Sequence, residues 1–213
     1  MFLTDQQWNE LLSALFQLAQ AQETDKRENA YRIFTTTPDI ISNQSPEAIV
    51  QAFQKGFNDE SVQVRLAAMD AFGAFFRINE RPVQAKFYQL IPDVLNILPP
   101  IKESQDSEDL SKALIALIDL AESAPKMFKP LFSNLVQFSI SVIQDKTLDD
   151  VCRQNALELM ATFADYAPSM CRKDTTYTND MITQCLSLMT DLGADDDDAA
   201  EWLDSDDVSL HEP

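Results

Sequence analysis

Residues 58–76, NDESVQVRLAAMDAFGAFF, decide the fold of this chain. They open with Asp59 in a short polar turn and continue into a run of apolar residues at helical spacing. Arg65 stands near the start of this run. Apolar residues occupy more than one side of the expected helix, which indicates that the helix packs against two neighbours. The segment therefore predicts the junction between two helices of a hairpin, with the second helix deeply buried.

The same pattern recurs along the chain. The pattern consists of an Arg, an Ala three residues later and an apolar residue four further on. It begins at Arg27, Arg65 and Arg153, and Ser111 occupies the equivalent position of the Arg in another unit. The starts lie 38, 46 and 42 residues apart, which is typical of helix-pair repeats of the HEAT and armadillo type. We predict an all-α fold, an α-α superhelix (HEAT-repeat solenoid) of about four and a half repeats.

The predicted repeat array covers residues 1–192, with units 1–38, 39–81, 82–125, 126–168 and a partial unit 169–192. We expect one helix over 82–98 that bends at Pro92, a similar bend at Pro130, and a polar linker over 102–109. The last helix, 177–192, has an apolar stripe but no second helix after it. We therefore expect an excised piece of a longer solenoid, followed by an acidic, disordered loop or tail over 193–213.

Four charged residues are predicted to be structural. In repeats of this type, an Asp in the turn and an Arg opening the second helix can hydrogen bond between successive units and form a ladder along the stack. Asp59 and Arg65 carry this motif in the second unit, and Arg27 and Arg153 occupy the equivalent Arg position in other units. For Asp59 and Arg65 this structural role is preferred to a catalytic one.

The composition argues against an enzyme, a metal site and a cofactor. The three Gly residues are too far apart to form a phosphate-binding loop. The only His, His211, has no zinc-ligand partners, and no nucleophile has a base nearby in a known motif. The cysteines, Cys152, Cys171 and Cys185, form no Cys-x-x-Cys pair and are expected to be reduced thiols of an intracellular protein. No apolar segment approaches the roughly 18 residues needed to cross a bilayer, so no membrane contact is expected.

The C-terminal segment carries much of the negative charge. The last 23 residues contain eight Asp and two Glu without any Lys or Arg, in a chain of net charge −19. Such a chain repels nucleic acid and attracts basic partners. A solvated linker stays open as an alternative, whereas an EF-hand calcium loop is disfavoured because its Gly and terminal Glu are absent. Since a Trp amid acids is an anchor for a partner, partner binding is expected of Asp195, Asp196, Asp197, Asp198, Glu201, Trp202, Asp204, Asp206 and Asp207.

Helix pairs followed by LSLMTDL (186–192) and DDDDAAEWL (195–203) resemble the importin-β (karyopherin-β) nuclear transport receptors, most closely the karyopherin beta-3 branch. The resemblance covers essentially the whole chain. It implies a non-enzymatic, monomeric receptor of cytoplasm, nucleus and nuclear pore that holds basic cargo, such as ribosomal proteins and histones, on its concave side. It also implies contacts with Phe-Gly nucleoporins in slots between first helices, and cargo release by Ran-GTP. The acidic segment corresponds to a family loop that contacts Ran or basic cargo.

Two other functions are compatible with the residues. The first is a general HEAT scaffold, for a phosphatase or a translation factor, in which the acidic segment is only a spacer. The second is an acidic chaperone for basic proteins that acts through the segment alone.

Overall fold

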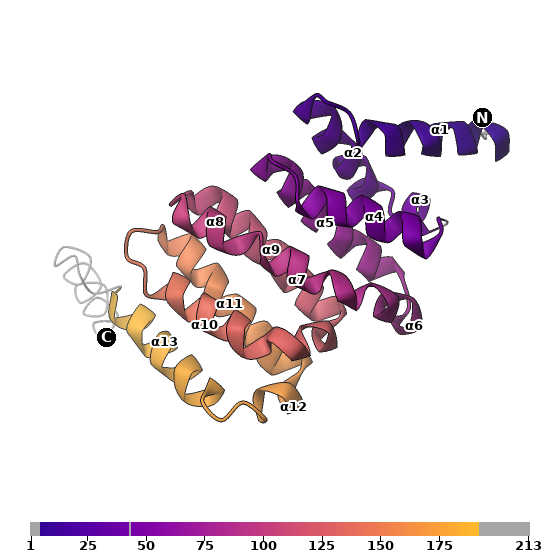
Figure 1. Cartoon of the computed structure of the whole chain (residues 1–213). Coiled ribbons are helices and arrows are strands. Elements are labelled where there is room, and N and C mark those ends of the chain that lie inside the picture. Colours follow the sequence, from indigo (N-terminus) through magenta and orange to yellow (C-terminus); the bar gives the residue numbers. More distant parts are fainter. Residues whose placement is uncertain (1–4, 43, 192–213) are drawn as a thin grey trace, which may run out of the picture.

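The computed structural model describes residues 5–42 and 44–191, and every regular element in that part of the chain is a helix. The all-α prediction is confirmed. The longer helices form pairs that follow one another along the array (Figure 1). The elements are α1 (Asp5–Leu18), α2 (Thr24–Thr36), α3 (Asp39–Ser42), α4 (Pro46–Phe57), α5 (Val62–Ile78), α6 (Arg81–Gln84), the 3-10 helix η1 (Ala85–Leu90), α7 (Ile91–Leu95), α8 (Leu98–Glu103), α9 (Ser107–Ser123), the 3-10 helix η2 (Pro125–Leu131), α10 (Phe132–Ile143), α11 (Asp150–Tyr166), α12 (Pro168–Cys171) and α13 (Tyr177–Asp191).

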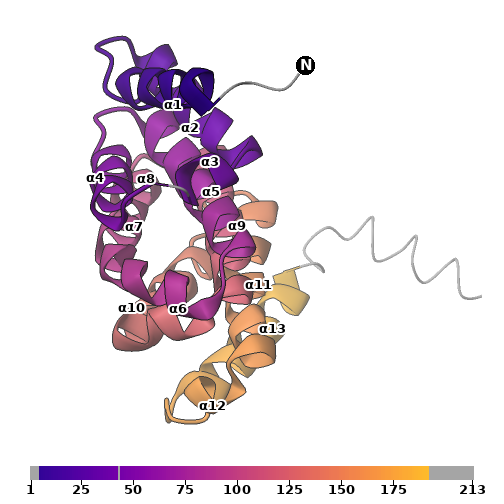
Figure 2. The same cartoon turned by 90° about the vertical axis from the view of Figure 1, so that its right-hand side faces the viewer.

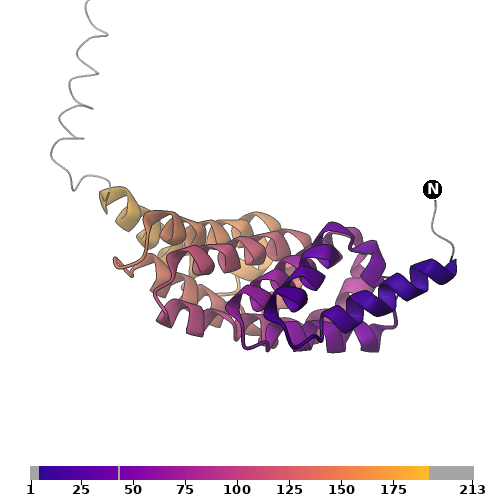
Figure 3. The same ribbon diagram turned by 90° about the horizontal axis from the view of Figure 1, so that it is seen from above.

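The array has two layers. The second helices of successive pairs pack directly on one another, α2 on α5, α5 on α9 and α9 on α11. Figure 2 shows α5, α9 and α11 in one layer and α4, α7 and α10 in the other. Figure 3 shows an elongated array with α1 and α13 at opposite ends. Because each pair packs mainly on its neighbours, the array exposes long surfaces rather than one central cleft.

Short polar residues define where several helices begin. Ser45 precedes α4, its Oγ accepts a hydrogen bond from the Ala48 amide, and Pro46 takes the first helical position, where the missing N–H costs nothing. Asp106 caps α9 by accepting from the Asp109 amide at 3.0 Å. Ser45 and Asp106 thus set the direction of one helix in each layer.

Prolines break the first helices of the third and fourth units more sharply than the sequence suggests. The expected single helix over 82–98 is divided into α6, η1 and α7, with Pro92 in the first turn of α7. The expected bend at Pro130 is likewise a change from η2 to α10. A proline removes one backbone donor and crowds the preceding turn, and here the chain responds by tightening to 3-10 geometry.

The expected polar linker over 102–109 is also shorter than predicted. The helix α8 continues to Glu103 and α9 begins at Ser107, so three residues join them. Gln105 makes this tight turn with a positive φ of 58°. The Asp106 cap lets α9 start earlier than its apolar residues indicate, because capping does not depend on hydrophobic periodicity.

The core is richest in aromatic rings around α5. Phe72 and Phe76 are 4.5 Å apart between ring centroids, and Phe53 of α4 lies 4.9 Å from Phe72, both edge to face. Phe87 of η1 contacts Phe75 at 5.0 Å in the same geometry. All five rings are almost fully buried. This cluster ties the second unit to the third, since edge-to-face pairs add to the stabilisation from apolar burial.

Candidate functional site

A buried ion pair joins the first unit to the second. Nε and Nη2 of Arg27, on α2, donate to the two carboxylate oxygens of Asp59 at 2.7 and 2.9 Å. Both side chains are only 7% exposed. The remaining Nη1 of Arg27 donates to the carbonyl oxygens of Ala21 and Gln22 in its own turn. The pair is therefore bidentate and fully hydrogen bonded, the geometry in which a buried charge pair holds two elements in register.

The other predicted ladder residues are placed differently. Nη1 of Arg65 donates to the backbone carbonyls of Asp59 and Glu60, so its hydrogen bonds stay within its own turn. Nε of Arg153 donates to the carbonyl of Ile143, and its Nη1 donates to Asp150. The structure thus pairs Asp59 with Arg27 of the preceding unit, a contact between successive units of the kind expected for a ladder, while Arg65 donates to the backbone carbonyl of Asp59.

Polar pairs that the repeat pattern does not predict link the later second helices. Gln63 of α5 donates to both carboxylate oxygens of Asp109 on α9 at 3.0 and 3.1 Å. Arg77 and Asp119 pair between the same two helices. Each partner lies more than forty residues from the other in sequence. The only sequence signal for these contacts would be their common position on facing helices.

The charge environment of Asp59 depends on this geometry. Burial alone would raise the pKa of its carboxyl, but hydrogen bonds from Arg27 and from the Ser61 amide, with the charges of Arg27 and Arg65, hold the pKa below its usual value. A carboxylate with a lowered pKa stabilises the fold fully above the ordinary Asp pKa. It loses that contribution as the pH falls through the lowered pKa.

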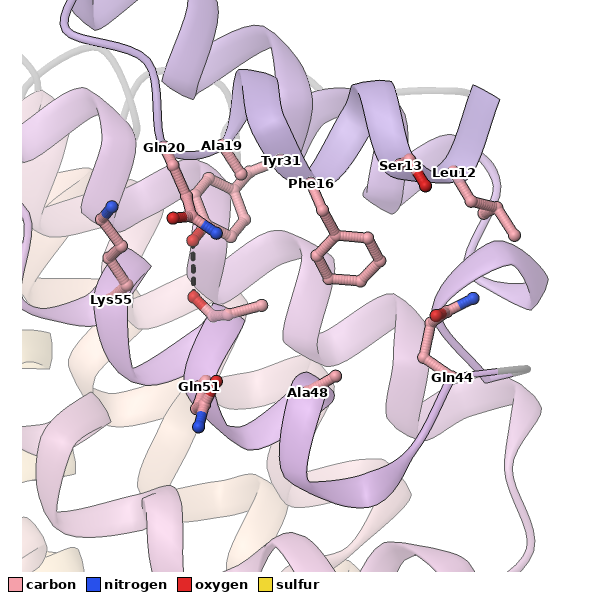
Figure 4. Close-up of a pocket in the computed structure, with 11 residues that line it drawn as sticks. Leu12, Ser13, Phe16, Ala19, Gln20, Tyr31, Gln44, Ala48, Gln51 and Lys55 are labelled. Carbon is pink, nitrogen blue, oxygen red and sulfur yellow. Dashed lines mark hydrogen bonds between the residues drawn. The ribbon is translucent and has the colours of Figure 1, made fainter. Parts of the chain in front are cut away.

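The candidate binding site is a pocket of about 610 Å³ between the first helices of the first two units, α1 and α4. Figure 4 shows Phe16 of α1 pointing toward Ala48 of α4, with Ala19, in the turn after α1, beside Tyr31. Tyr31 of α2 closes the inner side, and its hydroxyl donates to the carbonyl of Ala52 at 2.6 Å. Burial raises the pKa of the Tyr31 hydroxyl, so that it stays a neutral donor. The floor of the pocket is therefore largely apolar, and the Tyr31 hydroxyl is already hydrogen bonded.

The rim of this pocket is polar. The opening is surrounded by Gln20 in the turn after α1, by Gln44 just before α4, and by Gln51 and Lys55 on α4. Amide side chains can donate to and accept from an extended peptide backbone, while the floor has room for an aromatic or long aliphatic side chain. The pocket can thus hold a peptide with one apolar side chain. The resemblance implied slots between first helices without identifying the lining residues, because only packing reveals which face of α1 stays open.

The predicted partner-binding residues of the acidic segment lie outside the residues that the structure describes. These are Asp195, Asp196, Asp197, Asp198, Glu201, Trp202, Asp204, Asp206 and Asp207.

Within the described residues, no group of three or more His, Cys, Asp or Glu side chains is placed to hold a metal ion. Over the same residues, no helix is both long and apolar enough to pass through a membrane. Cys152, Cys171 and Cys185 are free thiols. Burial, with nearby carboxylates, raises the pKa of Cys152 to about 11, so this thiol is a poor nucleophile near neutral pH.

Stacked helix pairs, charged inter-unit contacts and a slot between first helices define a solenoid-type binding protein. The comparisons identify its family. Residues 2–138 match the family model described as IPO5-like, TPR repeats, and residues 145–212 match the model described as Importin repeat. The chain belongs to this importin family, within the importin-β (karyopherin-β) nuclear transport receptors that the sequence resembles.

Curated relatives agree. The chain is 38% identical to importin subunit beta-3 of Saccharomyces cerevisiae over 205 residues, which are 96% of this chain and 19% of that protein. It is 23% identical to a probable importin-5 homolog of Dictyostelium discoideum, over 93% of this chain and 19% of that one. The chain thus spans about a fifth of the length of these relatives.

Solved structures confirm the predicted HEAT-type solenoid. Kap121p bound to Nup53p matches with a TM-score of 0.85 and 37% identity, covering 92% of this chain and 19% of Kap121p. Kap121p bound to Pho4p matches equally well. Receptors of this family carry proteins and are not enzymes, in agreement with the absence of a predicted catalytic site.

Proposed function

We propose that this chain is part of a nuclear import receptor that carries basic cargo proteins, such as ribosomal proteins and histones, through the nuclear pore and releases them to Ran-GTP. Membership of the importin family carries the proposal. The net charge of −19 supports a preference for basic cargo, because the field of an acidic surface attracts cations and speeds their association. Such a receptor works in both cytoplasm and nucleus.

Within this function, the acidic residues Asp195 to Asp198, Glu201, Trp202, Asp204, Asp206 and Asp207 are proposed to bind a basic partner. Clustered carboxylates provide attraction that salt weakens, since exposed charges are screened over about 8 to 10 Å under physiological conditions. Trp202 adds an apolar anchor among these charges.

Release of cargo by Ran-GTP is testable on the full-length receptor. We expect at least about tenfold weaker binding of a basic cargo, such as a histone, when Ran-GTP is present, because two ligands that favour different states of a solenoid oppose each other. Fluorescence anisotropy of labelled cargo measures the change, and Ran-GDP is the control. Equal cargo affinity with Ran-GTP and Ran-GDP would contradict the transport mechanism and favour a general scaffold.

The acidic-chaperone alternative makes a different prediction. A peptide of residues 195–207 should bind a histone by itself if the segment alone acts, and deletion of these residues should abolish histone binding by the chain. If binding survives the deletion, the surface of the solenoid is responsible.

We also propose that the pocket between α1 and α4 takes the Phe side chain of a Phe-Gly nucleoporin. Three features support this: the pocket lies between first helices, its floor is apolar, and its rim carries amides. The relative Kap121p has been solved bound to Nup53p.

A large side chain that fills the pocket should weaken binding of a Phe-Gly peptide. We expect Ala48→Trp to weaken binding of a Phe-Gly peptide about tenfold, since losing the burial of one aromatic ring removes roughly 1.5 to 3 kcal/mol. Ala85→Trp, at an exposed position on η1, is the matched control and should leave affinity unchanged. Peptide titration followed by nuclear magnetic resonance measures both. An unchanged affinity in a folded Ala48→Trp variant would place the nucleoporin contact elsewhere.

A further inference from the structure

Positive side chains gather along one edge of the array, although the chain has a net charge of −19. At this edge each second helix ends and the next unit begins, and Figure 1 shows α6 and α12 on the same side of the array. Arg81, Lys126, Lys129, Arg172 and Lys173 are all exposed there. None of these five forms an ion pair with another described residue. Their charge is therefore free to attract an anionic group.

A cavity of about 510 Å³ opens at this edge, between η2 and α12. Lys126, Lys129 and Lys173 line it. Phe132, 4% exposed, contributes an apolar wall. Tyr166 borders the cavity with a ring that is 54% exposed, and it also borders a smaller cavity of about 130 Å³. The combination of three ammonium groups, an apolar wall and an open aromatic face fits an acidic segment that carries one large aromatic side chain.

One acid, Asp174, is among the lining residues of this cavity. Its Oδ2 accepts a hydrogen bond from Ser133 at 2.8 Å, and its Oδ1 accepts from the amide and hydroxyl of Thr176. These hydrogen bonds, that from Ser133 first, lower the pKa of Asp174. Asp174 is thus a charged acceptor already engaged by Ser133 of α10 and by Thr176 of its own turn, and the three lysines give the cavity a net positive charge.

We infer that the occupant of this cavity is the chain's own acidic segment, residues 195–207, with Trp202 against Tyr166 and Phe132 and the carboxylates on the lysines. The segment supplies the required chemistry, because it combines aspartates with a single Trp and contains no Lys or Arg. A nucleic acid is another anionic candidate for the cavity, but the net negative charge of this chain repels such a polyanion.

The segment can reach the cavity. The 15 residues of α13 run from the α12 edge to the opposite edge, a distance of about 22 Å at 1.5 Å per residue. Residues 192–202 span up to about 36 Å when extended. Trp202 can therefore return along α13 to the lysines, and the tether keeps its effective concentration near the cavity high.

Docking has a consequence that rests on the proposed function. Carboxylates held by Lys126, Lys129 and Lys173 are not available to a basic cargo, so docking and cargo binding by this segment exclude each other. The test below uses no cargo, and its outcome is therefore independent of the proposed function.

The 213-residue chain with Trp8→Phe has Trp202 as its only Trp, which makes Trp202 fluorescence a direct reporter. At about 20 mM salt we expect acrylamide to quench Trp202 roughly threefold less efficiently than at about 500 mM salt, where screening releases exposed ion pairs. The triple substitution Lys126→Glu, Lys129→Glu and Lys173→Glu should raise quenching at low salt to the high-salt value. The matched control, Lys26→Glu, Lys112→Glu and Lys146→Glu at exposed or half-exposed positions outside the cavity, changes the net charge equally and should keep Trp202 protected.

A second variant tests the same contact without changing any residue of the helical array, so that misfolding of the lysine variant cannot decide the result. Changing Asp195, Asp196, Asp197 and Asp198 to Asn leaves the described fold untouched and should also expose Trp202. The inference is overturned if Trp202 in the parent chain is quenched as efficiently as in a free peptide of residues 192–213. It is also overturned if the control variant raises the quenching of Trp202 as much as the cavity lysine variant does. Protection of Trp202 that increases with protein concentration would overturn it too, because a second copy would then be the occupant.

Discussion

Replacing Arg27 with Ala is expected to lower the free energy of unfolding by about 3 kcal/mol, because it leaves the Asp59 carboxylate buried without its ion-pair partner. The value is at the lower end for a broken buried pair, since Asp59 keeps the hydrogen bond from the Ser61 amide and the nearby charge of Arg65. Arg32→Ala is the matched control. Arg32 lies on the same helix and pairs with Glu28, but its side chain is 67% exposed, so the loss should stay below about 0.5 kcal/mol.

Urea unfolding followed by circular dichroism measures both Arg variants, and hydrogen exchange shows where the loss occurs. Because repeats are stabilised by their interfaces with neighbours, Arg27→Ala should first weaken protection in α1 and α2.

The pH dependence of the free energy of unfolding should change as well. The parent chain loses the Asp59 contribution as the pH falls below the ordinary Asp pKa, and Asp59→Asn should remove that part of the acid sensitivity. Equal losses for Arg27→Ala and Arg32→Ala would show that the bidentate pair contributes little.

Gly56→Ala should destabilise the chain by about 2 kcal/mol or more through overpacking. A methyl group at Gly56 would lie 2.6 Å from the Tyr31 ring and 2.7 Å from Cβ of Ala68. Neither neighbour can withdraw easily, since Tyr31 is fixed by its hydrogen bond to Ala52 and Ala68 belongs to the buried face of α5. The close approach of α4 to α2 and α5 therefore requires Gly at this position.

Gly73→Ala is the matched control for Gly56→Ala, with the opposite sign expected. At Gly73, within α5, the nearest atom to a new methyl group is Cβ of Asp119 at 4.0 Å, an ordinary contact. Ala is favoured over Gly inside a helix, so we expect stabilisation by about 0.5 to 1 kcal/mol. Thermal and urea unfolding of the two variants measure the difference. Destabilisation of both variants to the same extent would refute the steric explanation.

The repeat architecture was accessible from the residues because it depends on local and periodic features. The spacing of Arg27, Arg65 and Arg153 marks repeated units, and hydrophobic periodicity predicts helices. Proline geometry was less accessible. Whether Pro92 bends a helix or divides it depends on the neighbouring turns, and the structure shows division into α6, η1 and α7.

The last helix shows the same limit. Its expected stripe of Met181, Ile182, Cys185, Leu186 and Met189 is divided between two surroundings. Met181 packs against the core and Cys185 is half-buried, whereas Ile182, Leu186 and Met189 are 54%, 57% and 67% exposed. Periodicity identified an apolar helix without showing which part of its stripe contacts α10 and α11.

The sequence by itself determined the helical repeats, the excess of negative charge and the resemblance to importin-β receptors, because each of these is a property of residue types and their spacing. Only the tertiary structure decided that Arg27 is the residue that pairs with Asp59, that a pocket opens between α1 and α4, and that three lysines share one cavity. These features join residues of different units. Their geometry depends on how neighbouring helices pack, and packing is a three-dimensional property that local spacing does not contain.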